Sequence, residues 1–343
     1  MPSPDHSVPL AAPAGRAVHI LDQDARLQLT DGLLTVERPG QPPLRLRLPE
    51  IGALSIHGRA SLSTPCLHAL LAEGIPVTWR SGSGYLLGQT VGPAAGGSAL
   101  RRAQYAAVGT RLGVDISRRL IAGKLANQRA VLRRRAELPP VAAADRAITA
   151  LMPRVAQAEP PALLGLEGAA GAAYFRCWPA LLRGPAAALP FPGRNRRPPR
   201  DPINAALSYA YAVLAGDCAA AAQAAGLDPA EGILHAPAPG RPALALDLME
   251  PFRPLVADRA VLFAFNTGMI GAGDWAAQAE GVLLAASGRR ALLAALAQRR
   301  EQSFATADGS ETSYRAALTD LGLSLARALR TGAAGALAVP VRR

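Results

Sequence analysis

Cysteine, lysine and aromatic residues are scarce in this chain of 343 residues, and each shortage excludes a class of protein. The three cysteines are an odd number, widely spaced and without a C-x-x-C pair, which argues against a disulfide framework and a thiolate zinc site. We expect Cys66, Cys177 and Cys218 to be small buried hydrophobic side chains instead. Aromatic residues make up 4% of the chain, which argues against a ligand held mainly by ring stacking.

Long hydrophobic runs are also missing. No stretch of about 18 uninterrupted apolar residues occurs, and residues 1–13 lack the basic flank and hydrophobic run of a signal peptide. We therefore expect no membrane span, no membrane partner and a cytoplasmic location. Because 50% of the residues are hydrophobic, the chain has enough core for one large domain or two ordinary ones, which excludes overall disorder.

Positive charge is abundant and unevenly placed. The chain holds 37 basic and 25 acidic residues, a net charge of +12, and Lys124 is its only lysine. Residues 1–97 contain seven basic and seven acidic side chains, so the whole excess lies after residue 97. A basic part joined to a neutral part indicates that only the second part meets a polyanion.

The hydrophobic pattern divides the chain at the same place. Between residues 18 and 89, apolar residues alternate in short runs broken by Asp-Gly and Pro-Gly turns, which predicts strands and hairpins. Beyond the linker-like residues 93–98 the period becomes helical. We predict an α+β protein with a flexible tail (1–15), a small β-rich domain (16–97) and a larger all-helical domain (98–343).

Local signals place the helices. One helix interrupts the strands, with Ser63 or Thr64 as N-cap, Pro65 in its first turn and Gly74 as its stop. The helical period after the linker predicts seven helices, near 100–135, 142–157, 160–182, 202–225, 246–265, 273–301 and 311–330.

Four polar residues of the second part are candidates for chemistry. Glu167 lies among glycines and alanines, so that a metal or phosphate can approach it, although such a stretch also suits tight helix packing. His235 is the only imidazole after residue 97, although a lone histidine is commonly structural. Asp247 and Glu250 share one helix face, but they also resemble a capping pair. Together, carboxylates with one imidazole suit Mg²⁺ or Mn²⁺ better than structural zinc, and such an ion can activate a phosphodiester.

Four blocks carry a family resemblance. GLEGAA (165–170), PINAALSYAY (202–211), GLDP followed by GILH (226–235) and RPALALDLMEPFRP (241–254) together resemble the CRISPR-associated Cas-one endonuclease family, which acts as the integrase of CRISPR adaptation. GRASLST (58–64) and LRRAQY (100–105) agree more loosely. The resemblance runs from about residue 18 to residue 330.

The resemblance implies an N-terminal β-domain that forms a homodimer and a helical catalytic domain with one divalent metal site. Matched block by block, the ligands are Glu167, His235 and Glu250, with Asp247 as an accessory catalytic carboxylate. Relatives can carry aspartate at the position of Glu250, so whether Asp247 or Glu250 binds the ion directly stays open. Glu167 and Glu250 would hold an ion acting as Lewis acid, and His235 would complete the shell or protonate the leaving oxygen.

The implied activity is insertion of short double-stranded DNA spacers into a CRISPR repeat array. A fragment's 3′-hydroxyl attacks a phosphodiester, without a nucleotide cofactor and together with a small ferredoxin-like Cas-two partner. Two alternatives stay open. One is a metal-dependent nuclease of another class that acts only by hydrolysis, and the other is a non-catalytic nucleic-acid scaffold.

Arginines are the candidates for DNA contact. Residues 101–135 hold ten basic residues and one acid, Asp115, and several of the arginines recur at near-integral helical turns. A solvated helix face paired to Asp115 explains some of them but not the surplus, so we predict contacts with the phosphate backbone. The candidates are Arg111, Arg118, Arg129 and Arg133 on the helix, Arg194, Arg196, Arg197 and Arg200 in a loop, and Arg241 and Arg253 beside the carboxylates.

Overall fold

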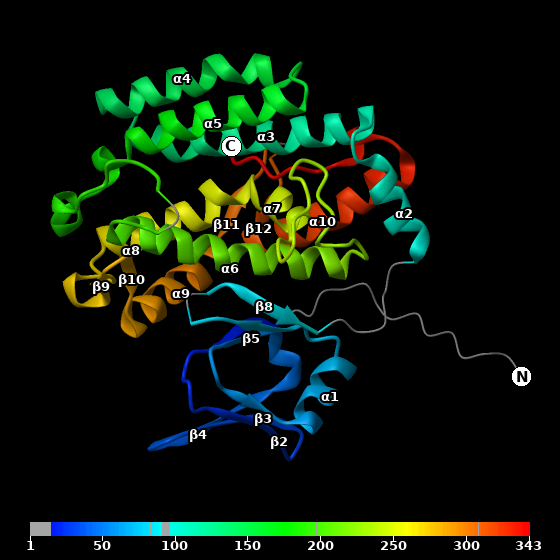
Figure 1. Ribbon diagram of the computed structural model, residues 1–343, viewed down its shortest axis with the longest axis vertical. Coiled ribbons are helices and arrows are strands. Elements are labelled where there is room, and N and C mark those ends of the chain that lie inside the picture. The colour runs from blue at the N-terminus through cyan, green and yellow to red at the C-terminus, as the bar shows by residue number, and fades with distance from the viewer. Residues whose placement is uncertain (1–14, 83, 91–96, 196–197, 308) are drawn as a thin grey trace, which may run out of the picture.

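The computed structural model describes residues 15–82, 84–90, 97–195, 198–307 and 309–343. A part made mainly of strands comes first and a larger, mostly helical part follows; Figure 1 shows them as the lower and upper halves of the molecule. This confirms the predicted α+β class. The predicted tail and linker lie mostly outside the described residues.

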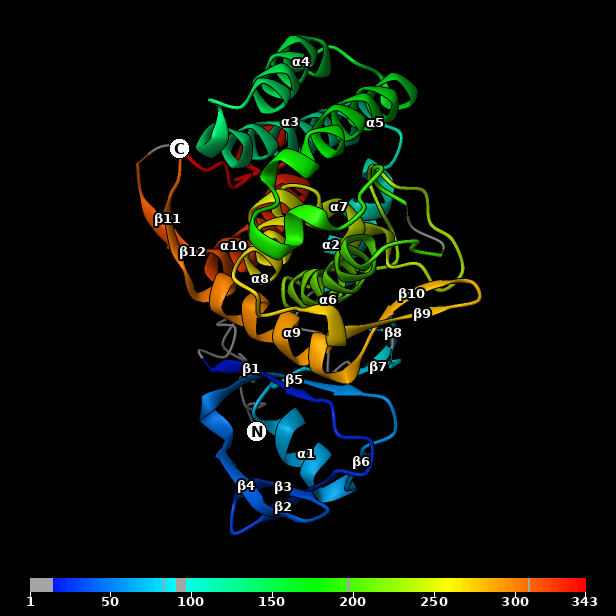
Figure 2. The same cartoon turned by 90° about the vertical axis from the view of Figure 1, so that its left-hand side faces the viewer.

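Two four-stranded sheets with a helix between them form the N-terminal part (Figure 2). The strand orders are β1-β5-β7-β8 and β4-β3-β2-β6. Inward-facing residues of both sheets and of the helix form one hydrophobic core. The elements are β1 (Arg16–Ile20), β2 (Arg26–Thr30), β3 (Leu33–Arg38), β4 (Gln41–Arg47), β5 (Ile51–His57), β6 (Ser61–Leu62), α1 (Thr64–Ala72), β7 (Val77–Arg80) and β8 (Leu86–Gln89).

The predicted turn and cap signals of this part are confirmed. Asp31 and Gly32 have φ of 53° and 75° and join β2 to β3, as a tight two-residue hairpin requires. The Ser63 hydroxyl accepts a hydrogen bond from the Cys66 amide at 3.4 Å, which makes Ser63 the N-cap of α1. Gly74, with φ of 67°, follows the end of the helix.

The second part is a layered bundle around its own hydrophobic core. Figures 1 and 2 show α6 inside this bundle, below α3, α4 and α5. The elements are α2 (Ser98–Ala107), α3 (Arg111–Leu132), α4 (Pro139–Val155), α5 (Pro160–Arg176), α6 (Pro202–Ala224), α7 (Ala243–Met249), α8 (Arg259–Asn266), β9 (Trp275–Gln278), β10 (Gly281–Leu284), α9 (Ala286–Glu301), β11 (Ser303–Ala305), β12 (Glu311–Ser313) and α10 (Tyr314–Thr331).

By length and composition α6 could cross a membrane, but 67% of its most apolar window is buried inside the protein. Packing within the domain therefore accounts for its apolar character. The three cysteines are free and buried, as predicted.

Several predicted helices have wrong boundaries. The span 100–135 is two helices, because Gly109 takes a φ of 73° and the Thr110 hydroxyl caps the start of α3. The span 273–301 begins with the hairpin β9–β10 before α9, and the Val282 amide of that hairpin donates to the Pro199 carbonyl at 2.8 Å. The span 246–265 is interrupted near Pro251, which lacks a backbone donor, and by a π-helical segment at 253–258.

A buried arginine joins the two parts. Arg80 of β7 is 1% exposed and donates to the carbonyl oxygens of Ala212 at 2.8 Å and Val213 at 3.3 Å in α6. Gly216 leaves room for it, since a Cβ there would lie 1.9 Å from an Arg80 terminal nitrogen. The sheet β1-β5-β7-β8 is therefore fixed against α6, and α6 in turn lines the candidate site.

Candidate functional site

Glu167 lies in the middle of α5, on a stretch with little side-chain bulk. Gly165, Gly168 and Gly171 surround it along the helix, and a Cβ at any of these glycines would meet no atom within 4 Å. The Glu167 side chain is 19% exposed. Its carboxylate therefore borders open space on one side and contacts Lys124 on the other.

Lys124 of α3 lies between two carboxylates. Its ammonium forms an ion pair with Glu167 and a second one with Glu250 Oε2 at 2.5 Å. The Lys124 side chain is only 8% exposed. Because a buried ammonium needs compensating negative charge, these two contacts explain how the only lysine of the chain can lie here.

Glu250 follows the last turn of α7 and is almost completely buried. Burial by itself would raise the pKa of this carboxyl, but Arg253 and Lys124 together lower the pKa to about 2. Arg253 Nε lies 3.1 Å from Glu250 Oε1. Glu250 is therefore a buried carboxylate that stays ionised at neutral pH.

His235 is oriented by Asp247. His235 Nδ1 lies 2.6 Å from Asp247 Oδ1, and the Asp247 carboxylate also accepts the backbone amides of Ile233, Leu234 and His235 at 2.6, 3.0 and 2.9 Å. Asp247 is 0% exposed. These four contacts leave His235 Nε2 directed at the other carboxylate, 3.9 Å from Glu250 Oε1.

This geometry bears on the question left open by the sequence, whether Asp247 or Glu250 would bind an ion directly. All of its near contacts are with the 233–235 segment, so binding an ion directly would break several buried hydrogen bonds. Asp247 is a positioning residue for His235, and Glu250 is the carboxylate that faces Lys124. Asp247 and Glu250 are three residues apart, which suggested a shared helix face, but their carboxylates contact different groups.

The structure brings Glu167, Glu250 and His235 to one place, where the cation present is the Lys124 ammonium. Among the described residues, no group of three or more His, Cys, Asp and Glu side chains is close enough together to hold a metal as it stands. The donor set nevertheless has the composition that a hard divalent ion requires, and a histidine fixed by a carboxylate through Nδ1 is typical of metal ligands.

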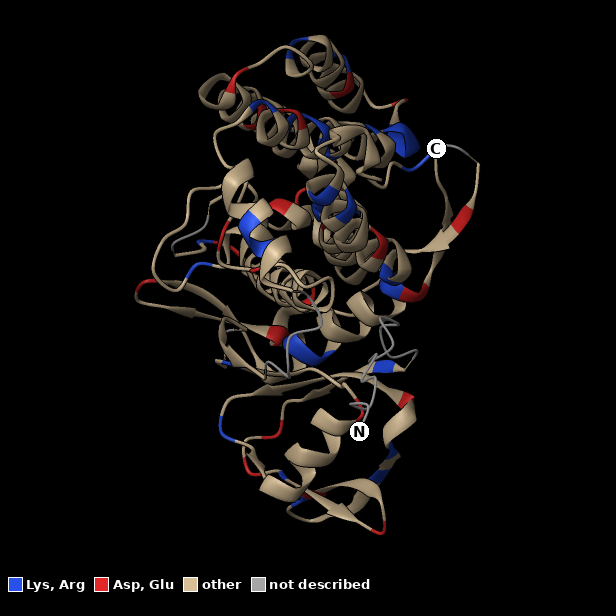
Figure 3. Cartoon of the chain, turned by 90° about the vertical axis from the view of Figure 1, so that its right-hand side faces the viewer, with Lys and Arg blue, Asp and Glu red and all other residues tan. Residues whose placement is uncertain are grey.

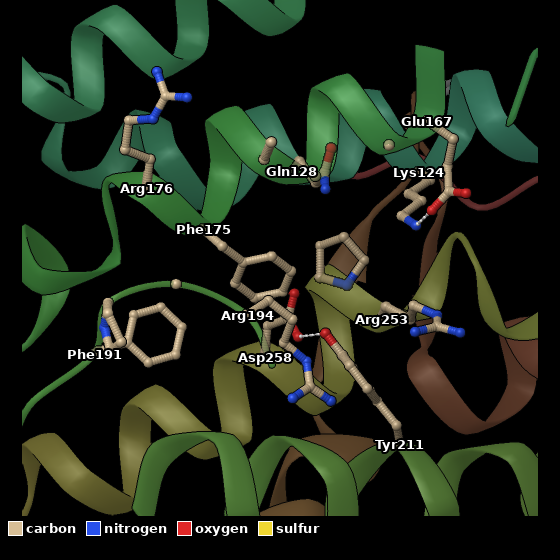
Figure 4. A pocket seen from close by; sticks show the side chains of 16 residues that line it. Lys124, Gln128, Glu167, Phe175, Arg176, Phe191, Arg194, Tyr211, Arg253 and Asp258 are labelled. Carbon is tan, nitrogen blue, oxygen red and sulfur yellow. Dashed lines mark hydrogen bonds and ion pairs between the residues drawn. The ribbon is translucent and has the colours of Figure 1, made fainter. Parts of the chain in front are cut away.

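A pocket of about 480 Å³ opens beside these carboxylates. Figure 4 shows Glu167 and Lys124 at one end and Phe175, Phe191 and Arg176 at the other. Arg253 also lines the pocket. An elongated anionic ligand can therefore reach Glu167 along a wall that carries positive charge and aromatic rings.

Tyr211 and Asp258 form the floor of this pocket. The Tyr211 hydroxyl donates to Asp258 Oδ1 at 2.5 Å, and burial raises the pKa of Asp258 to about 6. Arg253 and Arg194 lie over the Tyr211 ring, with guanidinium carbons 4.6 and 5.4 Å from its centroid. This network fixes both arginines next to the carboxylates.

The arginines predicted to contact DNA fall into different environments. Arg118 is buried, donates to the Ala158 carbonyl at 2.9 Å and pairs with Asp115 and Glu159, so the structure corrects its assignment to a structural one. Arg129 pairs with Asp145 at 2.8 Å. The predicted arginine stripe on α3 is therefore not one exposed surface.

The other predicted arginines are distributed as follows. Arg253 and Arg194 line the pocket, and Arg111, Arg133, Arg200 and Arg241 are exposed, Arg111 beside Asp115. Arg196 and Arg197 lie outside the described residues. Figure 3 shows basic segments on helices throughout the upper, helical half.

Lys124 lies in the candidate site, although the sequence did not point to it. Its uniqueness in a chain of arginines was a usable signal, because an arginine fork does not fit where one compact ammonium lies between two carboxylates. Asp258 and Tyr211 were also missed, and their separation along the chain gave no local signal.

The chain is similar to known proteins over most of its length. The family described as "CRISPR associated protein Cas1" matches residues 18–298. A CRISPR-associated exonuclease Cas4/endonuclease Cas1 fusion from Rhodospirillum rubrum is 42% identical over 300 residues, covering 84% of this chain and 52% of the fusion. A CRISPR-associated endonuclease Cas1 of the same organism is 38% identical over 298 residues, covering 83% of this chain and 86% of that protein.

The chain spans about half the length of the fusion proteins that it matches. Among solved structures, a chain of a "Cas6-RT-Cas1--Cas2 complex" superposes with a TM-score of 0.79 at 25% identity, covering 95% of this chain and 36% of the other. The match over most of the sequence and the shared fold lead to one conclusion: the chain belongs to the Cas1 family of CRISPR-associated proteins.

Proposed function

We propose that this chain is a divalent-metal-dependent DNA endonuclease and integrase that inserts short DNA spacers into a CRISPR repeat array. The observation that carries the proposal is the meeting of Glu167 and Glu250 at one buried cation position, with His235 Nε2 beside it and a basic pocket next to it. Negative charge within a positive wall suits phosphodiester chemistry, because arginines hold the backbone while the carboxylates hold a metal.

Glu167, Glu250 and His235 are the residues that would hold Mg²⁺ or Mn²⁺. The ion would supply Lewis acidity at the scissile phosphate. Lys124 lies between the two glutamates and balances their charge, so it has to withdraw from one of them when an ion binds. Asp247 keeps Nδ1 of His235 engaged, which leaves Nε2 as the lone-pair donor.

The pocket residues orient the DNA. Arg253 and Arg194 are held over Tyr211 and can contact phosphates without a large loss of side-chain entropy. Phe175 and Phe191 offer ring surface at the far end, where an unpaired terminal base can lie. A 3′-terminal hydroxyl would then attack the target phosphodiester, forming one P–O bond while the target's own 3′-oxygen leaves.

The partners are part of this proposal. The similar chain of known structure comes from a complex that contains Cas2, which supports a small Cas2-type partner here. A homodimer through the β-rich part and a cytoplasmic location are proposed with it. The hydrolytic nuclease and the non-catalytic scaffold are the competing functions.

One experiment separates the three functions. Purified protein, with and without a Cas2-type partner, is given Mn²⁺, a labelled fragment and a supercoiled plasmid that carries a repeat. Integration predicts labelled plasmid with a 3′-hydroxyl fragment and none with a 3′-dideoxy fragment. Nicked but unlabelled plasmid would indicate hydrolysis. If Glu167→Ala changes no activity, the scaffold function holds instead.

A further inference from the structure

Four arginines from separate segments lie near one another around α8 and α9. They are Arg134 after α3, Arg259 at the start of α8, Arg299 near the end of α9, and Arg342; we refer to them as the α8–α9 arginine cluster. Asp258 lines the pocket described above, whereas Arg259 lines a second hollow that shares no residue with it. This cluster is therefore separate from the candidate catalytic site.

The cluster lacks negative charge. Within the described ranges, none of its four arginines forms an ion pair with an Asp or Glu. Burial lowers the pKa of Arg259 to about 10, and the next largest causes are Arg134 and Arg342. Burial likewise lowers the pKa of Arg299 to about 9, followed by the charge of Arg259. The guanidinium groups thus repel one another, and no carboxylate of the described residues pairs with them.

Two of the arginines are fixed by Tyr314. The Tyr314 hydroxyl accepts from Arg299 at 2.6 Å and from Arg342 at 3.0 Å, and the Arg299 guanidinium lies 4.2 Å from the ring centroid. Arg299 Nε also donates to the Leu255 carbonyl at 2.7 Å. Because these contacts fix the position of the charge before any ligand arrives, an incoming anion loses little to side-chain ordering.

Arg259 has a hydrogen-bond donor for which the described residues supply no acceptor. Its Nη1 is buried and has no hydrogen-bond partner. The hollow that it lines has a volume of about 70 Å³ and also carries Gln298, Arg299 and Gln302. It lies between α8 and α9, which pack side by side (Figure 2). A buried guanidinium nitrogen without a hydrogen-bond acceptor is unfavourable, and an oxyanion with several acceptor oxygens is the group that matches it.

We propose that the α8–α9 arginine cluster binds a phosphate group of the DNA backbone, outside the catalytic site. DNA as the source of the phosphate rests on the proposed function. Guanidinium forks bind phosphate oxygens in pairs, and such a contact carries affinity without reading sequence. Arg134 is exposed, so one member of the cluster is accessible from solvent.

The test uses the full chain and two ligands. Arg259→Gln removes the unpaired charge, Arg134→Gln changes only an exposed cluster member, and Arg45→Gln is the control on an exposed strand residue of the neutral part. Inorganic phosphate is compared with chloride of equal ionic strength by thermal unfolding. We expect phosphate to raise the midpoint temperature of unfolding of the wild type and the control. In both cluster variants this increase should be smaller by about half or more.

The second arm measures binding of a duplex as a function of salt. Loss of one phosphate contact lowers the slope of log K against log salt by about 1 and weakens binding about three- to tenfold, in the cluster variants only. Unchanged phosphate stabilisation in both variants would overturn the site. A lost phosphate effect with an unchanged DNA slope would overturn DNA as the ligand. If the wild type binds no DNA, the proposed function fails while the phosphate arm still tests the site.

Discussion

Two clusters of basic side chains in the helical part differ in whether carboxylates accompany them. Lys124 and Arg253 contact Glu167 and Glu250 within the candidate catalytic site. The α8–α9 arginine cluster contains no such partner among the described residues. The same kind of charge therefore has opposite consequences: the first cluster is balanced and suits exchange of its ammonium for a metal ion, whereas the second is unbalanced and suits an anion.

The largest expected effect comes from removing a carboxylate from the balanced cluster. Glu250→Gln should lower strand joining about 10⁴-fold, since metal stabilisation of the transition state is worth several kcal/mol. DNA binding, measured by anisotropy, should persist, because the substitution removes negative charge. The matched control is Glu280→Gln, at an exposed position in the β9–β10 turn, and it should retain joining. Equal losses in both variants would contradict the assignment.

Removing the Lys124 ammonium tests whether it balances the charge of the two glutamates. Lys124→Met leaves two glutamates facing each other, which should cost about 3–5 kcal/mol of unfolding free energy in EDTA. Mn²⁺ should restore most of this loss, so the metal-induced rise in unfolding temperature should be larger in Lys124→Met than in the wild type. Arg45→Met removes an exposed cation of the neutral part and serves as control. A variant that Mn²⁺ does not stabilise would show that no ion takes the place of the ammonium.

A smaller loss is expected when the histidine keeps its ring but loses its orientation. Asp247→Asn retains the shape and removes the charge that accepts three backbone amides and His235 Nδ1. We expect activity to fall about 10–100-fold and Mn²⁺ affinity, measured by calorimetry, to weaken similarly. Full metal affinity in this variant would contradict a positioning role.

The junction between the two parts shows that buried basic groups are not by themselves an anion site. Burial, followed by Arg80 and Arg289, lowers the pKa of His57 to about 3, and burial followed by Arg300 lowers that of His19. Here the Arg80 guanidinium donates to carbonyl oxygens of α6 and Arg300 pairs with Asp217 at 2.5 Å, so both guanidinium groups have acceptors inside the protein. The junction therefore provides a comparison in which basic side chains are buried but have partners. It distinguishes the effect of burial from the effect of a missing carboxylate partner.

Acid titration of unfolding gives the smallest predicted effect. In the unfolded chain a histidine binds a proton below about pH 6.5, whereas the folded, buried histidine stays neutral. The free energy of unfolding therefore falls as pH drops, by about 1 kcal/mol per histidine between pH 7 and 5.5. Asp258, with its raised pKa of about 6, acts in the opposite direction, since its contribution is lost as pH rises. We therefore compare His57→Gln with the wild type by urea unfolding. The variant should lose about 1 kcal/mol less on acidification, and parallel curves would contradict a neutral buried His57.

Much of the fold could be predicted because local signals and global structure agree. The Asp31-Gly32 turn, the Ser63 cap and the change of period near residue 97 each fix one backbone choice, and the structure retains them. The failed boundaries lie where tertiary contacts override local preference. Alanine-rich residues 275–278 read as helix, yet they form a strand because the hairpin packs against residue 199.

The sequence by itself determined the class of fold, the excess of positive charge in the second part, and the residue types Glu167, His235 and Glu250 as candidates. These follow from composition, period and short motifs, which are local properties of a chain. Only the tertiary structure decided that Lys124 lies between the glutamates, that Asp247 holds the histidine, and that Arg259 Nη1 has no hydrogen-bond partner among the described residues. Those outcomes depend on distances between segments far apart in the chain, and whether a charge is balanced is a property of its surroundings in space.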